Sequence, residues 1–232
     1  MSRKTDVFEK LDYADHQHNE LCKNILTAGF ERCEIKFLRH LAAGILATSR
    51  EVFDYCANDI ADIHIAPYDG EILAKIQNGK IRPYFPLNTR SLATGSGGIF
   101  VRLKNANAAL YEYLSSFVGM VEGKVGRSGT LFNYGDLEDM SNMVNRKKHD
   151  IVIAVRPSGS GMIYAKCDGF EMMVPFAEQR GFSRITVSPE LNHVVGDHYI
   201  FETNGRDVMT FTMYCKNLAR MIMSDIYDKF IP

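Results

Sequence analysis

The chain has 232 residues, of which 46% are hydrophobic and 24% are charged, and its formal net charge is −1. This composition is typical of a folded globular protein and excludes wholesale disorder. The apolar runs fall short of the roughly 20 residues that cross a bilayer, and the first ten residues carry charges of both signs instead of a secretory signal. We therefore expect an intracellular, cytoplasmic protein with no membrane segment.

The cysteines also favour a reducing compartment. Their number is odd and none forms a C-x-x-C pair, which argues against a disulfide scaffold or a zinc site. We expect buried thiols, no metal and no cofactor. The cysteines are Cys22, Cys33, Cys56, Cys167 and Cys215.

The first third of the chain predicts helices. Apolar residues recur at helical spacing through 21–26, 35–45 and 49–60, and Gly29 is placed to end the first helix. Residues 1–71 hold 8 Lys or Arg and 13 Asp or Glu. We predict an acidic helical unit over 1–70 that packs on the rest of the chain or mediates self-association.

After residue 71 the hydrophobic period changes from 3.6 to 2. Two alternating stretches, 72–77 and 80–85, flank Asn78-Gly79, a pair that favours a type I′ hairpin turn. A Gly-rich loop at 94–98 then leads into a predicted strand. The later predicted elements are strands at 99–104, 151–156, 162–167, 183–188, 198–202 and 208–212, and helices at 107–121 and 214–230.

This order predicts an α+β fold. N-terminal helices are followed by antiparallel β-sheets with an interleaved helix and a C-terminal helix, so that a β-β-β-α unit is repeated. The sheets and their helices form the second predicted domain, 71–232.

Positive charge is concentrated in the middle of the chain. Residues 72–167 hold 13 Lys or Arg and 6 Asp or Glu, whereas 168–232 hold 6 and 9. The segment 72–111 contains no Asp or Glu, as expected next to a bound anion. The cations of this segment are Lys75, Lys80, Arg82, Arg90, Arg102 and Lys104.

Side chains alternate across a strand, so the predicted hairpin places cations and an aromatic ring on one face and aliphatic residues on the other. The strands at 99–104 and 162–167 repeat this division. A basic run, Arg146, Lys147 and Lys148, lies nearby in sequence. The predicted exposed face comprises Lys75, Lys80, Arg82, Tyr84, Phe100, Arg102, Lys104, Tyr164 and Lys166.

A face of cations and flat rings is suited to single-stranded nucleic acid. Cations bind the phosphates, and each base stacked on a ring contributes roughly 1–3 kcal/mol. We therefore predict a non-catalytic single-stranded nucleic-acid-binding protein. Lysine and arginine also solubilise the wet face of an ordinary antiparallel sheet, and this alternative stays open.

Two other functions stay open. The acidic N-terminal helices and the terminal helix are compatible with a self-associating structural or adaptor protein. An enzyme is compatible with the His/Asp group formed by His193, Asp197 and His198, although its spacing matches no standard zinc motif. The loop 94–98 lacks the lysine and the following helix of a P-loop, so we interpret it as a turn.

The order of elements after residue 71 resembles the Whirly family of single-stranded nucleic-acid-binding proteins. Gly79-Lys80 matches part of the family's Lys-Gly-Lys-Ala-Ala-Leu motif, and the strand 98–104 and terminal helix 214–232 have counterparts in the fold. The chain is also similar to the RNA-binding protein associated with the shell of nucleus-forming bacteriophages. These resemblances imply two packed sheets, self-association and binding of phage messenger RNA, which favours RNA over DNA.

Overall fold

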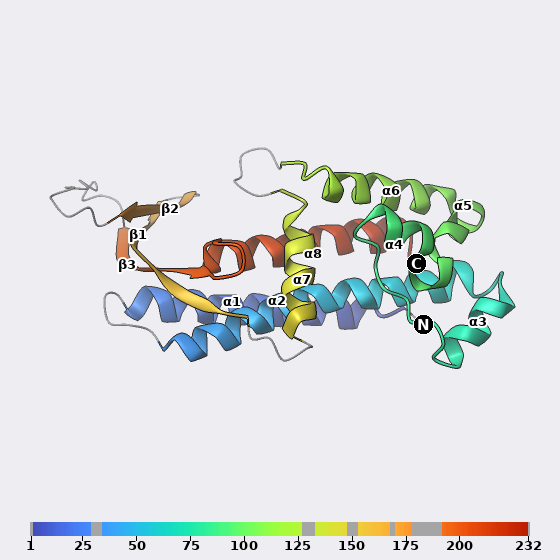
Figure 1. Cartoon of the computed structure of the whole chain (residues 1–232), viewed down its shortest axis with the longest axis horizontal. Helices are drawn as coiled ribbons and strands as arrows, with labels where there is room; N and C mark the ends of the chain where they lie inside the picture. The colour runs from blue at the N-terminus through green and yellow to red at the C-terminus, as the bar shows by residue number, and fades with distance from the viewer. Residues whose placement is uncertain are drawn as a thin grey trace.

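The computed structural model describes residues 2–28, 34–126, 133–147, 153–167, 170–177 and 192–231, with the backbone alone for 27–28, 146–147, 159–167, 170–177 and 192–197. Three long helices form its centre. They are α1 (Lys4–Ala28), α2 (Ile35–Ile60) and α8 (Val208–Lys229). Helix α1 runs antiparallel to the other two, so the start of α1 lies beside the ends of α2 and α8 (Figure 1).

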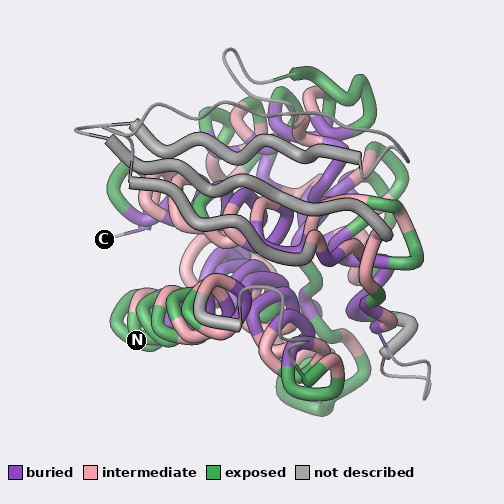
Figure 2. Tube along the Cα trace, turned by 90° about the vertical axis from the view of Figure 1, so that its left-hand side faces the viewer, coloured by how far each residue is buried: buried purple, intermediate pink, exposed green. Residues whose placement is uncertain are grey.

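The three helices associate because each presents a continuous buried stripe. Buried positions in α1 are three or four residues apart, the spacing with which helices pack side by side. Figure 2 looks along the bundle and shows buried residues between the helices and exposed ones outside. The buried positions of α1 are Val7, Leu11, Ala14, His18, Leu21 and Ile25. Those of α8 include Val208, Phe211, Cys215, Leu218, Ile222 and Ile226.

Smaller elements surround this bundle. Helix α6 (Ala108–Glu122) lies along one side and α7 (Asp136–Lys147) crosses the long helices (Figure 1). At one end are α3 (Gly70–Gln77), α4 (Thr89–Thr94) and α5 (Leu103–Ala106). At the other end is an antiparallel sheet, β1 (Val155–Cys167), β2 (Phe170–Ala177) and β3 (Asn192–Phe201), in the order β2-β1-β3. No helix in the described ranges is long and apolar enough to span a membrane.

A buried carboxylate joins the three long helices at the end where the chain begins. Asp59 of α2 is fully buried. Its Oδ1 accepts a hydrogen bond from Nη1 of Arg3 at 2.6 Å. Its Oδ2 accepts from the Arg3 backbone N–H at 2.7 Å and from the hydroxyl of Tyr227 at 2.8 Å. A buried charge is tolerated only when it is compensated in this way.

The predicted hairpin over 72–85 is wrong, because Asn78-Gly79 ends a helix. The carboxylate of Asp69 accepts from the backbone N–H of Ile72 at 3.1 Å and so caps α3. Gly79 has a φ of +66°, and the N–H of Lys80 donates to the carbonyl of Lys75. This is the Schellman ending of a helix, which needs the same left-handed glycine as a type I′ turn.

Two further predicted strands are helical. In 99–104 the residues Ile99, Phe100 and Leu103 are buried, a spacing of one helical turn, and they lie in a 3₁₀ turn and α5. The segment 208–212 forms the first turns of α8, where Asp207 accepts from the N–H of Thr210 at 2.7 Å. Helix α6 confirms the helix predicted over 107–121, and α8 contains most of that predicted over 214–230.

The strand predicted at 162–167 and the last two residues of the one predicted at 151–156 lie in a single strand, β1. Residues 153–154 are not in a strand, and 151–152 lie outside the described residues. The predicted turn between them is a change of register between Pro157 and Gly161. Part of β3 matches the strand predicted at 198–202, and 183–188 lies outside the described residues. Helices α4 and α7 were not predicted.

The Whirly-like β-β-β-α repeat is therefore wrong, and with it the proposed relationship to both families. Most described residues are helical, and the described strands form one sheet. The predicted division into 1–70 and 71–232 stays a prediction, although α8 packs against both α1 and α2.

Gly79→Ala should destabilise the protein by about 1 kcal/mol, since an L-residue is strained at this left-handed position. Urea denaturation measures the change. Gly70→Ala is the matched control at the other end of α3: no atom lies within 4 Å of its added Cβ, so we expect no loss. Equal effects of the two substitutions would contradict the helix ending described above.

Tyr227→Phe should lower the free energy of unfolding by about 2 kcal/mol, because a hydrogen bond to a buried charge contributes roughly 1.5–3 kcal/mol. Urea denaturation again measures it. The control is Tyr13→Phe in α1, whose ring is 57% exposed and whose hydroxyl we expect to be replaceable without loss. If Tyr227→Phe leaves the free energy of unfolding unchanged, the hydrogen bond from Tyr227 is not required to bury Asp59.

Candidate nucleic-acid interface

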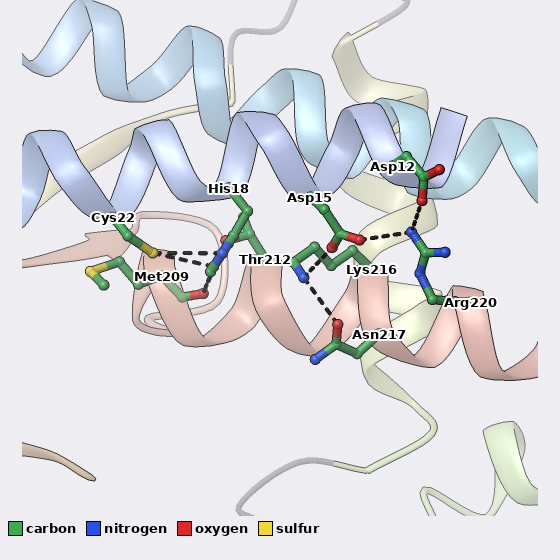
Figure 3. Close-up of polar contacts among 9 residues, drawn as sticks. All are labelled: Asp12, Asp15, His18, Cys22, Met209, Thr212, Lys216, Asn217 and Arg220. Carbon is green, nitrogen blue, oxygen red and sulfur yellow. Dashed lines mark hydrogen bonds and ion pairs between the residues drawn. The ribbon is translucent and has the colours of Figure 1, made fainter. Parts of the chain in front are cut away.

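Two regions of the described structure concentrate polar side chains, and the first is the seam between α1 and α8. Acidic residues of α1 face basic residues of α8 (Figure 3). Arg220 bonds Asp12 and Asp15, each at 2.7 Å, and Lys216 bonds Asp15 at 2.5 Å. Burial opposes ionisation of Asp15, but these bonds outweigh it and lower the pKa of Asp15. Two of the acidic side chains of α1, Asp12 and Asp15, are thus compensated by α8.

The same seam contains His18, which is 7% exposed. Its Nε2 lies 3.0 Å from the carbonyl oxygen of Met209. The thiol of Cys22 is 3.6 Å from Nδ1 and 3.7 Å from Nε2 (Figure 3). A thiol activated by histidine points at one ring nitrogen, whereas these near-equal distances place the sulfur over the ring. The seam is therefore a structural contact between helices.

The second region is the end of the molecule that carries α3, α4 and α5. Here the alternation predicted for 80–85 holds without the hairpin. Lys80, Arg82 and Tyr84 are exposed, while Pro83 and Phe85 are buried. The chain over 81–87 is not helical. Phe85 packs on the core rings of Phe53 and Phe117, whose centres are 5.1 and 5.7 Å away.

A glycine turn holds this segment in place. The hydroxyl of Ser96 accepts from the backbone N–H of Tyr84 at 2.9 Å. Gly97 has a φ of +68°, and a Cβ there would lie 2.7 Å from Cδ1 of Ile81. The left-handed backbone at this position is what favours glycine. The loop predicted at 94–98 is thus a turn, as expected, and it supports the row of exposed side chains.

The exposed cations of this segment have no carboxylate partner. No ion pair or hydrogen bond involves the side chains of Lys80, Arg82 or Arg90 within the described part of the chain. Arg90 is exposed on α4, which directly follows the segment. We call Lys80, Arg82, Tyr84 and Arg90 the basic cap.

Other predicted contacts of the acid-free segment have structural roles. Lys75 pairs with Glu71 on α3. Arg102 bonds Asp69 at 2.7 Å and the carbonyls of the glycine turn at 3.1 and 3.3 Å. Phe100 is fully buried and so cannot stack on a base. Lys104 is exposed and lies 5.0 Å from the ring centre of Tyr111.

The remaining predicted residues lie elsewhere. Tyr164 and Lys166 are in β1, at the end of the molecule opposite the basic cap (Figure 1). Arg146 and Lys147 are the last residues of α7, and the structure describes only their backbone. Lys148 lies outside the described residues. The structure therefore does not assemble them with the cap into one sheet face.

The predicted His/Asp group lies in β3, where the side chains of His193 and Asp197 are outside the description. The ring of His198 is 3.3 Å from the carboxylate of Asp207, the residue that caps α8. Among the residues that the structure describes, no three His, Cys, Asp or Glu side chains come together to form a potential metal site.

One feature of this end was missed from the sequence. A cleft of about 440 Å³ opens between the connection before α3 and the helix α5. Tyr68 at its edge is 81% exposed. The flanking Pro67 and Asp69-Gly70 indicate a turn, but nothing in the sequence distinguishes an exposed ring from a buried one. The lining residues are Ile65, Tyr68, Asp69, Arg102, Asn105 and Ala106.

Comparisons with protein families, curated proteins and solved structures find no match to this chain.

His18→Leu should make the protein less sensitive to acid. Burial is the main cause that lowers the pKa of His18 below its ordinary 6.5; nearby Lys216 lowers it too, and the Met209 carbonyl and Asp15 partly offset this. The unfolded chain therefore takes up the proton first, and stability is lost as the pH falls below about 6.5. Urea denaturation at pH 7.5 and 5 measures the free energy of unfolding of both proteins. Relative to the native protein, the variant should be more stable at pH 5 than at pH 7.5. The same difference in free energy at both pH values would contradict this prediction.

Proposed function

We propose that the protein binds single-stranded nucleic acid without catalysis, through the basic cap. The observation that supports this most is that three exposed cations close together in sequence, Lys80, Arg82 and Arg90, have no carboxylate partner among the described residues. Several cations elsewhere on the bundle, such as Arg3, Lys10 and Lys216, are paired with acids. Unpaired cations are available to neutralise phosphates.

The ring of Tyr84 favours single strands over duplex. It is 49% exposed and lies on the same side of the segment as Lys80 and Arg82. An exposed ring offers a stacking surface to an unpaired base, whereas bases within a duplex already stack on each other. Within one segment, Lys80 and Arg82 can thus bind phosphates while Tyr84, two residues further on, stacks on a base.

The charge distribution favours binding at this end of the molecule. Two carboxylates at this end are paired with cations, Glu71 with Lys75 and Asp69 with Arg102. Glu122 accepts from the backbone N–H and hydroxyl of Thr89 at 2.7 and 2.6 Å and keeps its charge. Lys80, Arg82 and Arg90 have no carboxylate partner among the described residues. A chain with a net charge of −1 can therefore still attract a polyanion to one end.

No contact of the described residues favours RNA over DNA at the basic cap. Binding of both is therefore to be measured. Self-association through the helices and an enzyme site near 193–198 stay predictions, and no observation on the described residues favours either of them.

Binding of a labelled single-stranded oligonucleotide should weaken steeply with salt. Three phosphate contacts give a log–log slope of about −2, since each contributes about 0.7 on single strands. Affinity should therefore fall about 20-fold between 50 and 200 mM salt. Fluorescence anisotropy with RNA and DNA of the same sequence measures this. Absence of binding at 50 mM salt would refute the proposal.

Arg82→Glu should weaken binding and reduce the magnitude of the salt slope by about 0.7, the contribution of one phosphate contact on a single strand. The matched control is Lys36→Glu, because Lys36 is likewise exposed and unpaired in the described structure but lies at the start of α2, near the sheet end. Both substitutions change the net charge equally. Equal losses of affinity would mean that total charge, and not the basic cap, determines binding.

A further inference from the structure

The cleft beside Tyr68 adjoins the basic cap through a chain of contacts. Arg102 forms one wall of the cleft, and its guanidinium donates to the carbonyls of Gly97 and Gly98. Gly97 is packed against Ile81, between the cap residues Lys80 and Arg82. The same glycine turn thus contacts both the segment that carries the cap and one wall of the cleft.

The cleft is suited to an uncharged ligand. Its two charged residues, Asp69 and Arg102, neutralise each other at 2.7 Å. Asp69 also caps α3, and Arg102 also binds two carbonyls through Nη1. A phosphate or a free cation would gain less here than beside an unpaired charge, because the pair already offsets its own charges.

The other lining residues favour a flat ring with a polar edge. Tyr68, a residue that is 81% exposed, offers an aromatic ring. Ile65 and Ala106 contribute apolar surface. Asn105 is exposed and carries both a donor and an acceptor on its amide. The volume of about 440 Å³ lies within the range of small-ligand sites, which is roughly 300–1,000 Å³.

We infer that this cleft is a nucleobase pocket, in which Tyr68 stacks on the base and the Asn105 amide bonds to its edge. The inference rests on the proposed function, because it places in the cleft one base of a strand held by the basic cap. It adds a site that discriminates between bases, since an amide can match the donor and acceptor pattern of a base edge.

The chain contains no tryptophan, which allows a direct test. Tyr68→Trp places a single fluorescent reporter at the cleft, and Tyr13→Trp places one at another exposed ring, on α1. Each full-length variant is titrated with adenosine, which has no phosphate, and with a labelled single-stranded RNA whose binding is followed independently by anisotropy. We expect both ligands to quench Trp emission saturably at position 68 and not at 13.

The outcomes separate the two proposals. If the RNA binds by anisotropy but emission at position 68 is unchanged, the base pocket is refuted and the basic cap stands. If adenosine quenches emission at position 68 but no RNA binds, the pocket stands and the proposed function is refuted. If neither ligand has an effect, both are refuted.

Substitutions of the native ring supply a second measurement. Tyr68→Ala should weaken RNA binding about 5- to 150-fold, the range expected for loss of one stacked base. Tyr68→Phe should retain binding because it keeps the stacking face. Equal losses in the two variants would show that the hydroxyl, and not stacking, matters, and would overturn the inferred role of Tyr68.

Discussion

The packing of α8 into the groove between α1 and α2 is the constraint on which the rest of the structure depends. It buries a stripe from each helix, and some of the polar residues on those stripes bond across the interface. His18 meets the carbonyl of Met209, and Asp59 accepts bonds from Arg3 and Tyr227. Because a charge at Asp59 can be buried only with these partners in place, it sets the register of all three helices.

This register determines where the remaining chain can go. Helix α2 ends beside the start of α1, and the chain leaves the bundle there through the π-helical turn Ala61–Ile65. Residues 66–106 then form short helices and the segment 81–87 at that end. With little regular structure of its own, the segment is held by Phe85 inside and by the turn at Ser96 and Gly97 outside. The exposed row that we propose as a binding surface is thus a consequence of core packing.

Some charged side chains form ion pairs inside the protein, and others are exposed and could bind a ligand. Basic residues on α8 compensate the acidic side chains of α1, which explains why an N-terminal segment rich in acid does not leave a strongly negative surface along the bundle seam. In the acid-free segment 72–111, Lys75 and Arg102 are paired with carboxylates that precede it, Glu71 and Asp69. Lys104 lies against the ring of Tyr111. Lys80, Arg82 and Arg90 have no such contact among the described residues, and this makes them candidate ligand contacts.

Apolar stripes predicted α2, the end of α1 and most of α8 as helices, because those stripes repeat over several turns, and the pattern of 80–85 predicted its alternation of exposed and buried side chains. The first part of α1 was not predicted, and the first turns of α8 were predicted as a strand. The sequence by itself did not determine whether Asn78-Gly79 was a hairpin turn or a helix end, since both require a left-handed glycine. Likewise 99–104 could alternate as a strand or bury Ile99, Phe100 and Leu103 as a helical turn. Only the tertiary structure decided these cases, and only it exposed Tyr68, because short segments take the conformation that completes the core around them.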